Sequence, residues 1–198
     1  MNMEESLKLE RAFELFDQAN NEDPNKEKFQ GITYSKELLY AMRMTEKLRE
    51  FAPNASEPLK LTARCQHLCR WEIPRESYEM NRVGYLKWRQ DLKKFHAEKA
   101  SCILREVGYD QKTIDKVSFL LEKKQLKKNE DTQTLEDVIC LVFLEYYFEP
   151  FIEKHPEEKL IDIIQKTWNK MSAKGHNMAL KIPFSKTSFE LIQKALNN

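Results

Sequence analysis

Apolar residues recur at every third or fourth position along most of the chain, which is the spacing of amphipathic α-helices. The segment VICLVFL is apolar on all sides, so the helix that contains it is predicted to lie in the core. We therefore predict an all-α fold, a single helical bundle over residues 1–198 with no linker or internal repeat. The predicted helices cover residues 3–20, 33–53, 56–73, 86–107, 110–120, 134–151, 157–171 and 187–196.

Three stretches interrupt this helical pattern. NNEDPN follows the first helix and is predicted to be a loop, because Pro24 breaks a helix. IPRESYEMNRVGY, ending at Tyr85, is the one long irregular stretch, and ordered loops of this length are often functional. KMSAKGHNMAL, which begins at Lys170, is predicted to be a surface loop, and a lid over a binding site is the alternative.

The composition suits a helical protein of the cell interior. Charged residues make up 33% of the chain and there are only 4 glycines, which favours long solvated helices. No apolar run approaches about 18 residues and the N-terminus lacks a signal peptide, so we expect a cytoplasmic protein without a membrane segment. The net charge of +1 provides no global basic field, which disfavours nucleic acid as a partner without excluding it.

Two histidines and two acids are the candidate catalytic or metal-binding groups. His67 and His96 lie on the third and fourth predicted helices, and Asp137 and Glu145 lie two turns apart on the core helix. Neutral imidazoles and carboxylates that converge on one cleft would serve as metal ligands or as acid–base groups. The alternative is structural, because a histidine on a half-apolar face usually bonds within the fold and Asp137 suits the first turn of its helix.

Arginines and aromatic residues alternate in the segment before the fourth helix and at its start. Guanidinium groups bind phosphate or carboxylate in a bidentate manner, and aromatic rings can stack on a base. The alternative is a set of salt bridges to nearby acids such as Glu76 and Glu79. The predicted ligand-binding residues are Arg64, Arg70, Trp71, Arg75, Arg82, Tyr85, Trp88 and Arg89, together with Glu145 from the core helix.

Five long motifs carry a resemblance to a known family. QHLCRWEIPR, YEMNRVGYLKWR, FHAEKA, LEDVICLVFLEYY and WNKMSAKGH resemble the family known as domain of unknown function 4202, and the resemblance covers about residues 16–179. The family is uncharacterised, so this resemblance implies no particular reaction.

The order of the helices is also similar to that of the HD superfamily of metal-dependent phosphohydrolases, over a core of roughly residues 33–152 with extra helices at both ends. That superfamily carries a first His, a His-Asp pair, a further His and a late Asp. Here the first His is missing and Leu68 follows His67 in place of the Asp, while His96 and Asp137 match the later ligands. The resemblance implies at most a weakly bound divalent metal, with His67, His96 and Asp137 as candidate ligands.

Together these features predict binding of a phosphate-containing small molecule, such as a nucleotide, by a helical domain with an HD-like core. If catalysis occurs, the reaction is phosphoester hydrolysis, with His67, His96 and Asp137 as the catalytic groups. The second hypothesis is a bundle that binds a ligand, RNA or a protein and catalyses nothing. The missing metal ligands favour the second hypothesis, and the arginine–aromatic segment favours ligand binding.

Overall fold

The computed structural model describes residues 3–197, and within this range the regular structure is almost entirely helical, which confirms the all-α prediction. No helix in these residues is both long enough and apolar enough to cross a membrane. The α-helices are α1 (Met3–Asn21), α2 (Lys36–Phe51), α3 (Glu57–Cys65), α4 (Arg82–Val107), α5 (Gln111–Leu121), α6 (Glu130–Val142), α7 (Phe148–Ile152), α8 (Glu157–Lys170), α9 (Ala173–Ala179) and α10 (Lys186–Asn197). The remaining elements are β1 (Lys26–Phe29), β2 (Ile32–Ser35), the 3₁₀ helices η1 (Arg70–Glu72) and η2 (Arg75–Ser77), and the π-helix η3 (Phe143–Tyr147).

Side-chain caps explain why two helices begin about a turn earlier than the apolar pattern indicates. The Asn81 side chain accepts a hydrogen bond from the Gly84 amide and starts α4. The Asn129 side chain accepts one from the Thr132 amide and starts α6. Much of the long stretch predicted to be irregular before the fourth helix is therefore the first turn of α4 and the short helix η2.

The third helix is shorter than predicted, because α3 ends at Cys65 and the predicted helix runs to residue 73. Cys69 has a left-handed backbone with φ of 53°, and its amide donates a hydrogen bond to the Asn20 side chain at 2.9 Å. The chain therefore changes direction after α3. As a result, His67 lies in a turn between α3 and η1 and not on a helix.

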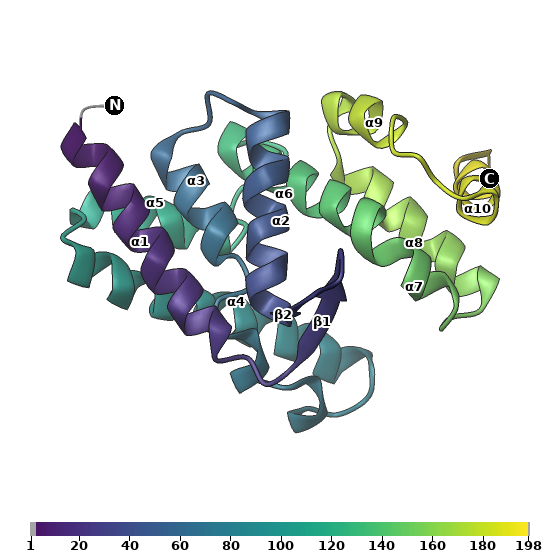
Figure 1. The fold of residues 1–198 in the computed structure, drawn as a ribbon. Helices are drawn as coiled ribbons and strands as arrows, with labels where there is room; N and C mark the ends of the chain where they lie inside the picture. The colour runs from purple at the N-terminus through teal and green to yellow at the C-terminus, as the bar shows by residue number, and fades with distance from the viewer. Residues whose placement is uncertain (1–2, 198) are drawn as a thin grey trace.

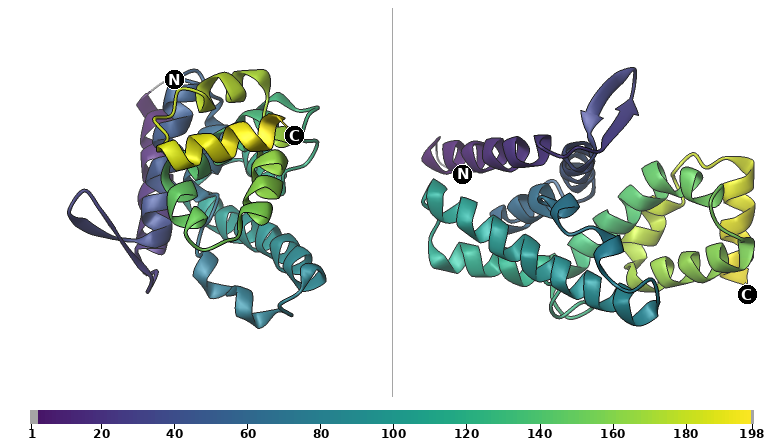
Figure 2. Two further views of the ribbon diagram at one scale, coloured as in Figure 1. Left: turned by 90° about the vertical axis from the view of Figure 1, so that its right-hand side faces the viewer. Right: turned by 90° about the horizontal axis from the view of Figure 1, so that it is seen from below.

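A two-stranded antiparallel hairpin precedes α2, where the sequence pattern predicts a loop and the start of a helix. β1 pairs with β2, and Phe29 lies opposite Ile32 beside the turn. Gln30 and Gly31 have φ of 50° and 82°, as the two central residues of a type I′ turn require. The hairpin projects from the helical body (Figure 2).

Arg43 of α2 holds the hairpin against the π-helix η3. Its guanidinium carbon lies 4.8 Å from the ring centre of Phe29 and 4.6 and 5.0 Å from the ring centres of Tyr146 and Tyr147. Arg43 also forms an ion pair with Glu27 at 2.6 Å and donates a hydrogen bond to the Tyr147 hydroxyl at 2.8 Å. These contacts fix the orientation of Tyr147 on η3.

Two clusters of buried apolar residues form the core. One contains Phe16 and Leu104 and joins α1, α3, α4 and α5, and the other contains Met44, Leu141 and Ile164 and joins α2, α6, α7, α8 and α10. In Figure 1, α1, α3 and α5 lie on one side of α2, and α8, α9 and α10 lie on the other. The core helix predicted over residues 134–151 is divided into α6, the π-helix η3 and α7. Most side chains of α6 are buried, as predicted.

The run KMSAKGHNMAL, predicted to be a surface loop, contains α9 instead. The Ser172 hydroxyl accepts a hydrogen bond from the Gly175 amide at 3.1 Å and caps this helix. A Cβ atom at Gly175 would lie 2.5 Å from the Asp137 carboxylate, so only glycine allows α9 to pack this closely on α6. The prediction missed α9 because the serine cap is followed by only seven helical residues.

Candidate anion-binding cleft

A cleft with a volume of about 980 Å³ lies between α2, α4, α6 and α8. The turn after α3, Lys123, which follows α5, and residues of η3 and α7 also contribute to its walls. This volume is typical of pockets that hold a small organic ligand. The predicted site residues that line the cleft are His67, Arg70, Tyr85, Trp88, Arg89 and His96.

One face of α4 forms a wall of the cleft. Its lining residues follow one another at alternating intervals of three and one, so they lie along a single helical stripe. These residues are Tyr85, Trp88, Arg89, Leu92, Lys93 and His96. Lys93 did not figure among the predicted site residues, although its position four residues after Arg89 and three before His96 is a signal that could have identified it.

One face of α8 forms the opposite wall with the same spacing. Its lining residues are Lys159, Asp162, Ile163, Lys166, Thr167 and Lys170. Sequence reasoning noted only Lys170, as the start of a surface loop or lid, and missed the others, because lysines and acids at helical spacing are also typical of a face that points to solvent. Only the packing of α8 beside α6 decides that this face borders a cleft.

Cations outnumber acids around the cleft. Eight lysine and arginine side chains line it, whereas only three carboxylates do. The cations are Lys36, Arg70, Arg89, Lys93, Lys123, Lys159, Lys166 and Lys170, and the acids are Glu37, Glu136 and Asp162. The cleft is therefore strongly positive although the whole chain has a net charge of +1.

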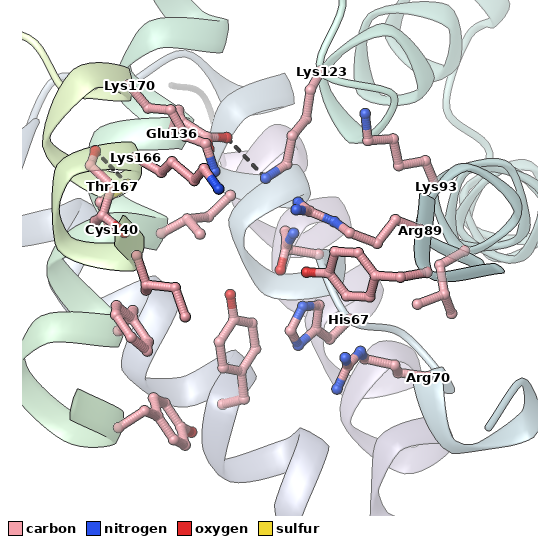
Figure 3. Close-up of a pocket in the computed structure, with 18 of the residues that line it drawn as sticks. His67, Arg70, Arg89, Lys93, Lys123, Glu136, Cys140, Lys166, Thr167 and Lys170 are labelled. Atoms are coloured by element: carbon pink, nitrogen blue, oxygen red, sulfur yellow. Dashed lines mark hydrogen bonds and ion pairs between the residues drawn. The ribbon is translucent and has the colours of Figure 1, made fainter. Parts of the chain in front are cut away.

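Four of these cations, which we call the cation cluster, surround the single carboxylate of Glu136: Arg89, Lys93, Lys123 and Lys170. Glu136 is 4% exposed and forms ion pairs with Lys123 at 2.8 Å and with Lys170 at 3.7 Å. Within the described residues, neither Arg89 nor Lys93 has a carboxylate oxygen within 4 Å. Figure 3 shows Arg89 and Lys123 approaching the same space from two sides, with Glu136 beside it. The cation cluster therefore carries positive charge that the protein itself does not neutralise.

The ionisation of Lys93 and Glu136 reflects this excess of charge. Partial burial lowers the pKa of Lys93, and repulsion by Lys123 and Arg89 lowers it further. Burial alone would raise the pKa of Glu136, but attraction to Lys123, Lys170 and Arg89 outweighs burial and lowers that pKa. An anion bound among these groups would relieve the repulsion that Lys93 experiences.

His67 lies between the cation cluster and Glu37 of α2. Its Nδ1 atom is 3.1 Å from the Glu37 Oε2 atom, and its ring stacks on Tyr40 with the centroids 3.9 Å apart. Burial lowers the pKa of His67 well below its ordinary value, and the charges of Arg70 and Lys123 lower it further. His67 is consequently a neutral imidazole at neutral pH, with Nδ1–H donated to Glu37.

His96 is the second imidazole of the cleft, and it is 5% exposed. Its Nδ1–H donates to the Leu68 carbonyl oxygen at 2.9 Å, and its ring centre lies 6.0 Å from that of His67. Burial lowers the pKa of His96 to about 3. The two histidines therefore converge, as predicted, and both are neutral.

The neutral state of His96 predicts a specific loss of stability in acid. Below about pH 6.5 the unfolded chain protonates this histidine while the folded protein does not, so the free energy of unfolding falls as the pH falls. The fall is expected to be about 1.4 kcal/mol per pH unit between about pH 6 and pH 4. Urea denaturation of the wild type and of His96→Asn, whose amide can still donate to Leu68, measures it. Equal pH slopes for the two proteins would show that His96 titrates normally in the folded state.

Aromatic side chains line the part of the cleft next to α2 and η3. Tyr40 lies between the His67 ring and Tyr147, whose ring centre is 6.0 Å from that of Tyr40. The π-helix η3 also supplies Phe143, which contacts Phe151 of α7 edge to face at 5.8 Å. π-helical segments occur frequently at functional sites. The cleft thus combines a strongly cationic part with an aromatic part.

Asp137 does not belong to the cleft, contrary to the prediction that it joins the two histidines. It is 1% exposed, and its carboxylate accepts hydrogen bonds from the Ser172 amide at 2.7 Å and the Ser172 hydroxyl at 2.6 Å. Adjacent residues on an α-helix point about 100° apart, so the side chain of Glu136 faces the cleft while that of Asp137 faces α9. The acid of α6 in the cleft is therefore Glu136.

Two further predicted site residues form ion pairs away from the cleft. Arg64 binds Asp17 of α1 through two nitrogens, one of them at 2.7 Å. Glu145 forms an ion pair with Lys47 of α2 at 2.6 Å. Both pairings join neighbouring helices, so these residues stabilise the fold and do not line the cleft.

Three predicted ligand-binding residues of the segment before α4 and at its start also lie outside the cleft. Arg75 donates hydrogen bonds to the backbone carbonyl oxygens of Tyr78 and Glu79 and so pins its own loop. Arg82 is exposed at the first turn of α4, and Trp71 packs against the core cluster of α1 and α4. The arginine–aromatic segment therefore divides into a structural part and a part that borders the cleft.

The candidate metal ligands His67, His96 and Asp137 are not brought together, because Asp137 is bonded to Ser172 on another face of α6. Across residues 3–197 no group of three or more histidine, cysteine, aspartate or glutamate side chains is placed so that it could hold a metal ion. The ammonium of Lys123 pairs with the cleft carboxylate Glu136 at 2.8 Å. The donor set suits an anion better than a divalent cation.

These features define an all-helical protein with a cationic, partly aromatic cleft. A family model described as Domain of unknown function (DUF4202) matches residues 10–192. The chain belongs to this family, as its motifs predict. A comparison with curated proteins gives no match, and a comparison with solved structures gives none.

Proposed function

We propose that this protein binds a phosphate-containing small molecule in the cleft. The observation that carries the proposal is the cation cluster, in which four cations surround the one carboxylate of Glu136. Partly buried positive charges without carboxylate partners raise the free energy of the empty protein, because burial removes the water that would solvate them. A bound phosphate would neutralise these charges and accept their hydrogen bonds.

The chemistry of the lining favours phosphate over other small anions. Arg89 presents a planar fork of donors, and the lysine ammoniums provide point charges that can contact different oxygens of one phosphate group. The donors come from α4, α8 and the segment after α5, so they approach a ligand from several directions. A tetrahedral phosphate offers oxygens in several directions, whereas a carboxylate offers two in one plane.

Hydrolysis of the bound phosphoester is the reaction that would accompany binding if the protein is an enzyme. A neutral His67 oriented by Glu37 is the form of imidazole that accepts a proton from an attacking water. The cation cluster would stabilise negative charge that develops on the phosphoryl oxygens. Release of inorganic phosphate by the wild type but not by His67→Gln would support this extension, and ligand binding without release would favour a binding module.

A thermal-shift screen with inorganic phosphate, sugar phosphates and nucleotides tests the binding proposal. A compound present at about 100 times its Kd should add about 2.7 kcal/mol to the free energy of unfolding, or roughly 5–10 °C to the Tm. The Lys93→Ala variant should bind this compound at least about tenfold more weakly, which corresponds to about 1.4 kcal/mol. Without the compound its Tm should be unchanged or higher, because a source of repulsion is removed.

Lys94→Ala is the matched control for Lys93→Ala. Lys94 is the next residue of α4, is exposed and does not line the cleft. Its replacement removes the same charge from the chain and should leave the ligand-induced shift intact. The proposal would be contradicted if both variants lost the ligand-induced increase in Tm to the same extent. It would also be contradicted if no phosphorylated compound raised the Tm of the wild type.

A further inference from the structure

We infer that the ligand of the cleft is a nucleotide with at least two phosphate groups, whose phosphates contact the cation cluster and whose base occupies the aromatic part and donates a hydrogen bond to Gln66. This inference rests on the proposed function, which requires only that some phosphorylated compound binds. The inference adds three features of the ligand to the proposed function: at least two phosphate groups, a planar base, and a hydrogen bond from that base to Gln66.

The charge of the cation cluster indicates more than one phosphate. Four cations around one carboxylate leave an excess of three positive charges. A monophosphate ester carries a charge of about −1.5 to −2 at neutral pH and would leave part of this excess uncompensated. A di- or triphosphate carries enough negative charge to balance the cluster, and its phosphates could reach Arg89 on α4 and Lys170 on α8 together.

The aromatic part of the cleft indicates a flat ring beside the phosphates. His67 and Tyr40 stack nearly parallel, with an interplanar angle of 13°, and His67 is also the histidine that experiences the charges of Lys123 and Arg89. The aromatic part therefore borders the cation cluster directly. Planar aromatic side chains bind bases by stacking, which contributes about 1–3 kcal/mol per base in nucleic-acid complexes.

Gln66 supplies an independent indication of a ligand with an N–H donor. It lines the cleft next to His67, it is 8% exposed, and its Oε1 atom has no hydrogen-bond partner within the described residues. A buried acceptor left without a donor costs roughly 1–3 kcal/mol. The oxygen itself is buried, and once the side-chain amide turns toward the cleft the amino or imino group of a nucleobase would satisfy it, whereas an inositol polyphosphate or an inorganic polyphosphate has no such N–H group.

Isothermal titration calorimetry with the 198-residue chain tests the inference. The probes are ATP, GTP, CTP and UTP, the mono- and diphosphates of the tightest binder, its nucleoside, tripolyphosphate and inositol hexakisphosphate. We expect the di- and triphosphates to bind at least about tenfold more tightly than the monophosphate and than tripolyphosphate, since each added contact of about 1.4 kcal/mol changes Kd tenfold. The affinity of the triphosphate should fall as salt is added.

Gln66→Met is the variant that separates base recognition from phosphate binding. It removes the unpartnered oxygen and keeps the length of the side chain, so the empty protein should be as stable as the wild type. Nucleotide affinity should fall about tenfold, the equivalent of one lost hydrogen bond, and tripolyphosphate affinity should not change. Equal effects of Gln66→Met on both probes would exclude a contact with the base.

The outcomes distinguish failure of the inference from failure of the proposed function. If the monophosphate binds as tightly as the triphosphate, or if inositol hexakisphosphate binds more tightly than every nucleotide, the inference is wrong and the proposed function stands. If none of the phosphorylated probes binds, and the Lys93→Ala variant gives the same titrations as the wild type, both the inference and the proposed function are wrong. Binding of the unphosphorylated nucleoside with the affinity of its triphosphate would also overturn the inference, because the cation cluster would then contribute nothing.

Discussion

The Leu68→Asp variant is expected to be largely unfolded at 37 °C. This substitution places an aspartate directly after His67, as in the His-Asp pair of the HD superfamily with which the sequence was compared. Leu68, however, is 0% exposed and packs in the core cluster that contains Leu61 and Leu104. A carboxylate placed there has no partner, and burying it should lower the free energy of unfolding by more than about 4 kcal/mol, a large part of the roughly 5–15 kcal/mol of a folded protein.

Circular dichroism during thermal and urea denaturation measures this effect, and Leu68→Met is the control. Methionine has nearly the volume of leucine, so the control should lose less than about 1.5 kcal/mol. Wild-type stability of Leu68→Asp, with a divalent metal bound beside His67, would mean that the side chain at position 68 reaches the cleft and that its assignment to the core is wrong. The expected result is that position 68 does not tolerate an aspartate.

Replacing Asp137 with alanine is expected to lower the free energy of unfolding by about 3 kcal/mol. The Asp137 carboxylate accepts the amide and hydroxyl hydrogen bonds of Ser172 and a longer bond of 3.3 Å from Gln133. The variant leaves the Ser172 amide without its partner and opens space beside Gly175, where α9 packs on α6. Glu130→Ala, at an exposed position in the first turn of the same helix, should cost less than about 1 kcal/mol.

A milder pair of variants separates this structural role from a role in the cleft. Asp137→Asn keeps an acceptor for the Ser172 amide and should retain the nucleotide-induced increase in Tm. Glu136→Gln, one residue earlier on α6, removes the negative charge that offsets the cation cluster and should strengthen phosphate binding. The functional acid would instead be at position 137 if a folded Asp137→Asn variant lost nucleotide binding while the Glu136→Gln variant bound nucleotide as the wild type does.

The helices were predictable because their signals are local. Apolar residues at helical spacing mark the buried face of each long helix, and the core position of α6 follows from VICLVFL alone. The hairpin was missed although Gln30–Gly31 is a recognisable two-residue turn, because the strands β1 and β2 have only four residues each. The early end of α3 was not predictable, since the bond that turns the chain joins Cys69 to Asn20 across 49 residues.

The site was only partly predictable because side chains of the same type serve different purposes. Arg89 and Arg70 line the cleft, whereas Arg64 pairs with Asp17 and Arg75 bonds to its own loop. A guanidinium group has the same capacity for hydrogen bonds in each place, so residue type and spacing cannot distinguish them. The partner that each arginine meets depends on how α1, α3 and α4 are packed.

The sequence by itself determined the family and the helical fold, since both depend on residue order or on spacing within one helix. It also singled out the two histidines, although only tertiary packing brings their rings together in the cleft. Tertiary packing decided that Glu136 and not Asp137 is the acid of the cleft. Both are charged neighbours on one helix, and only the positions of α8 and α9 determine which of the two helix faces borders the cleft. Packing also brought Lys93 and Lys170 together from α4 and α8, whose charges are too distant in sequence for any local pattern to relate them.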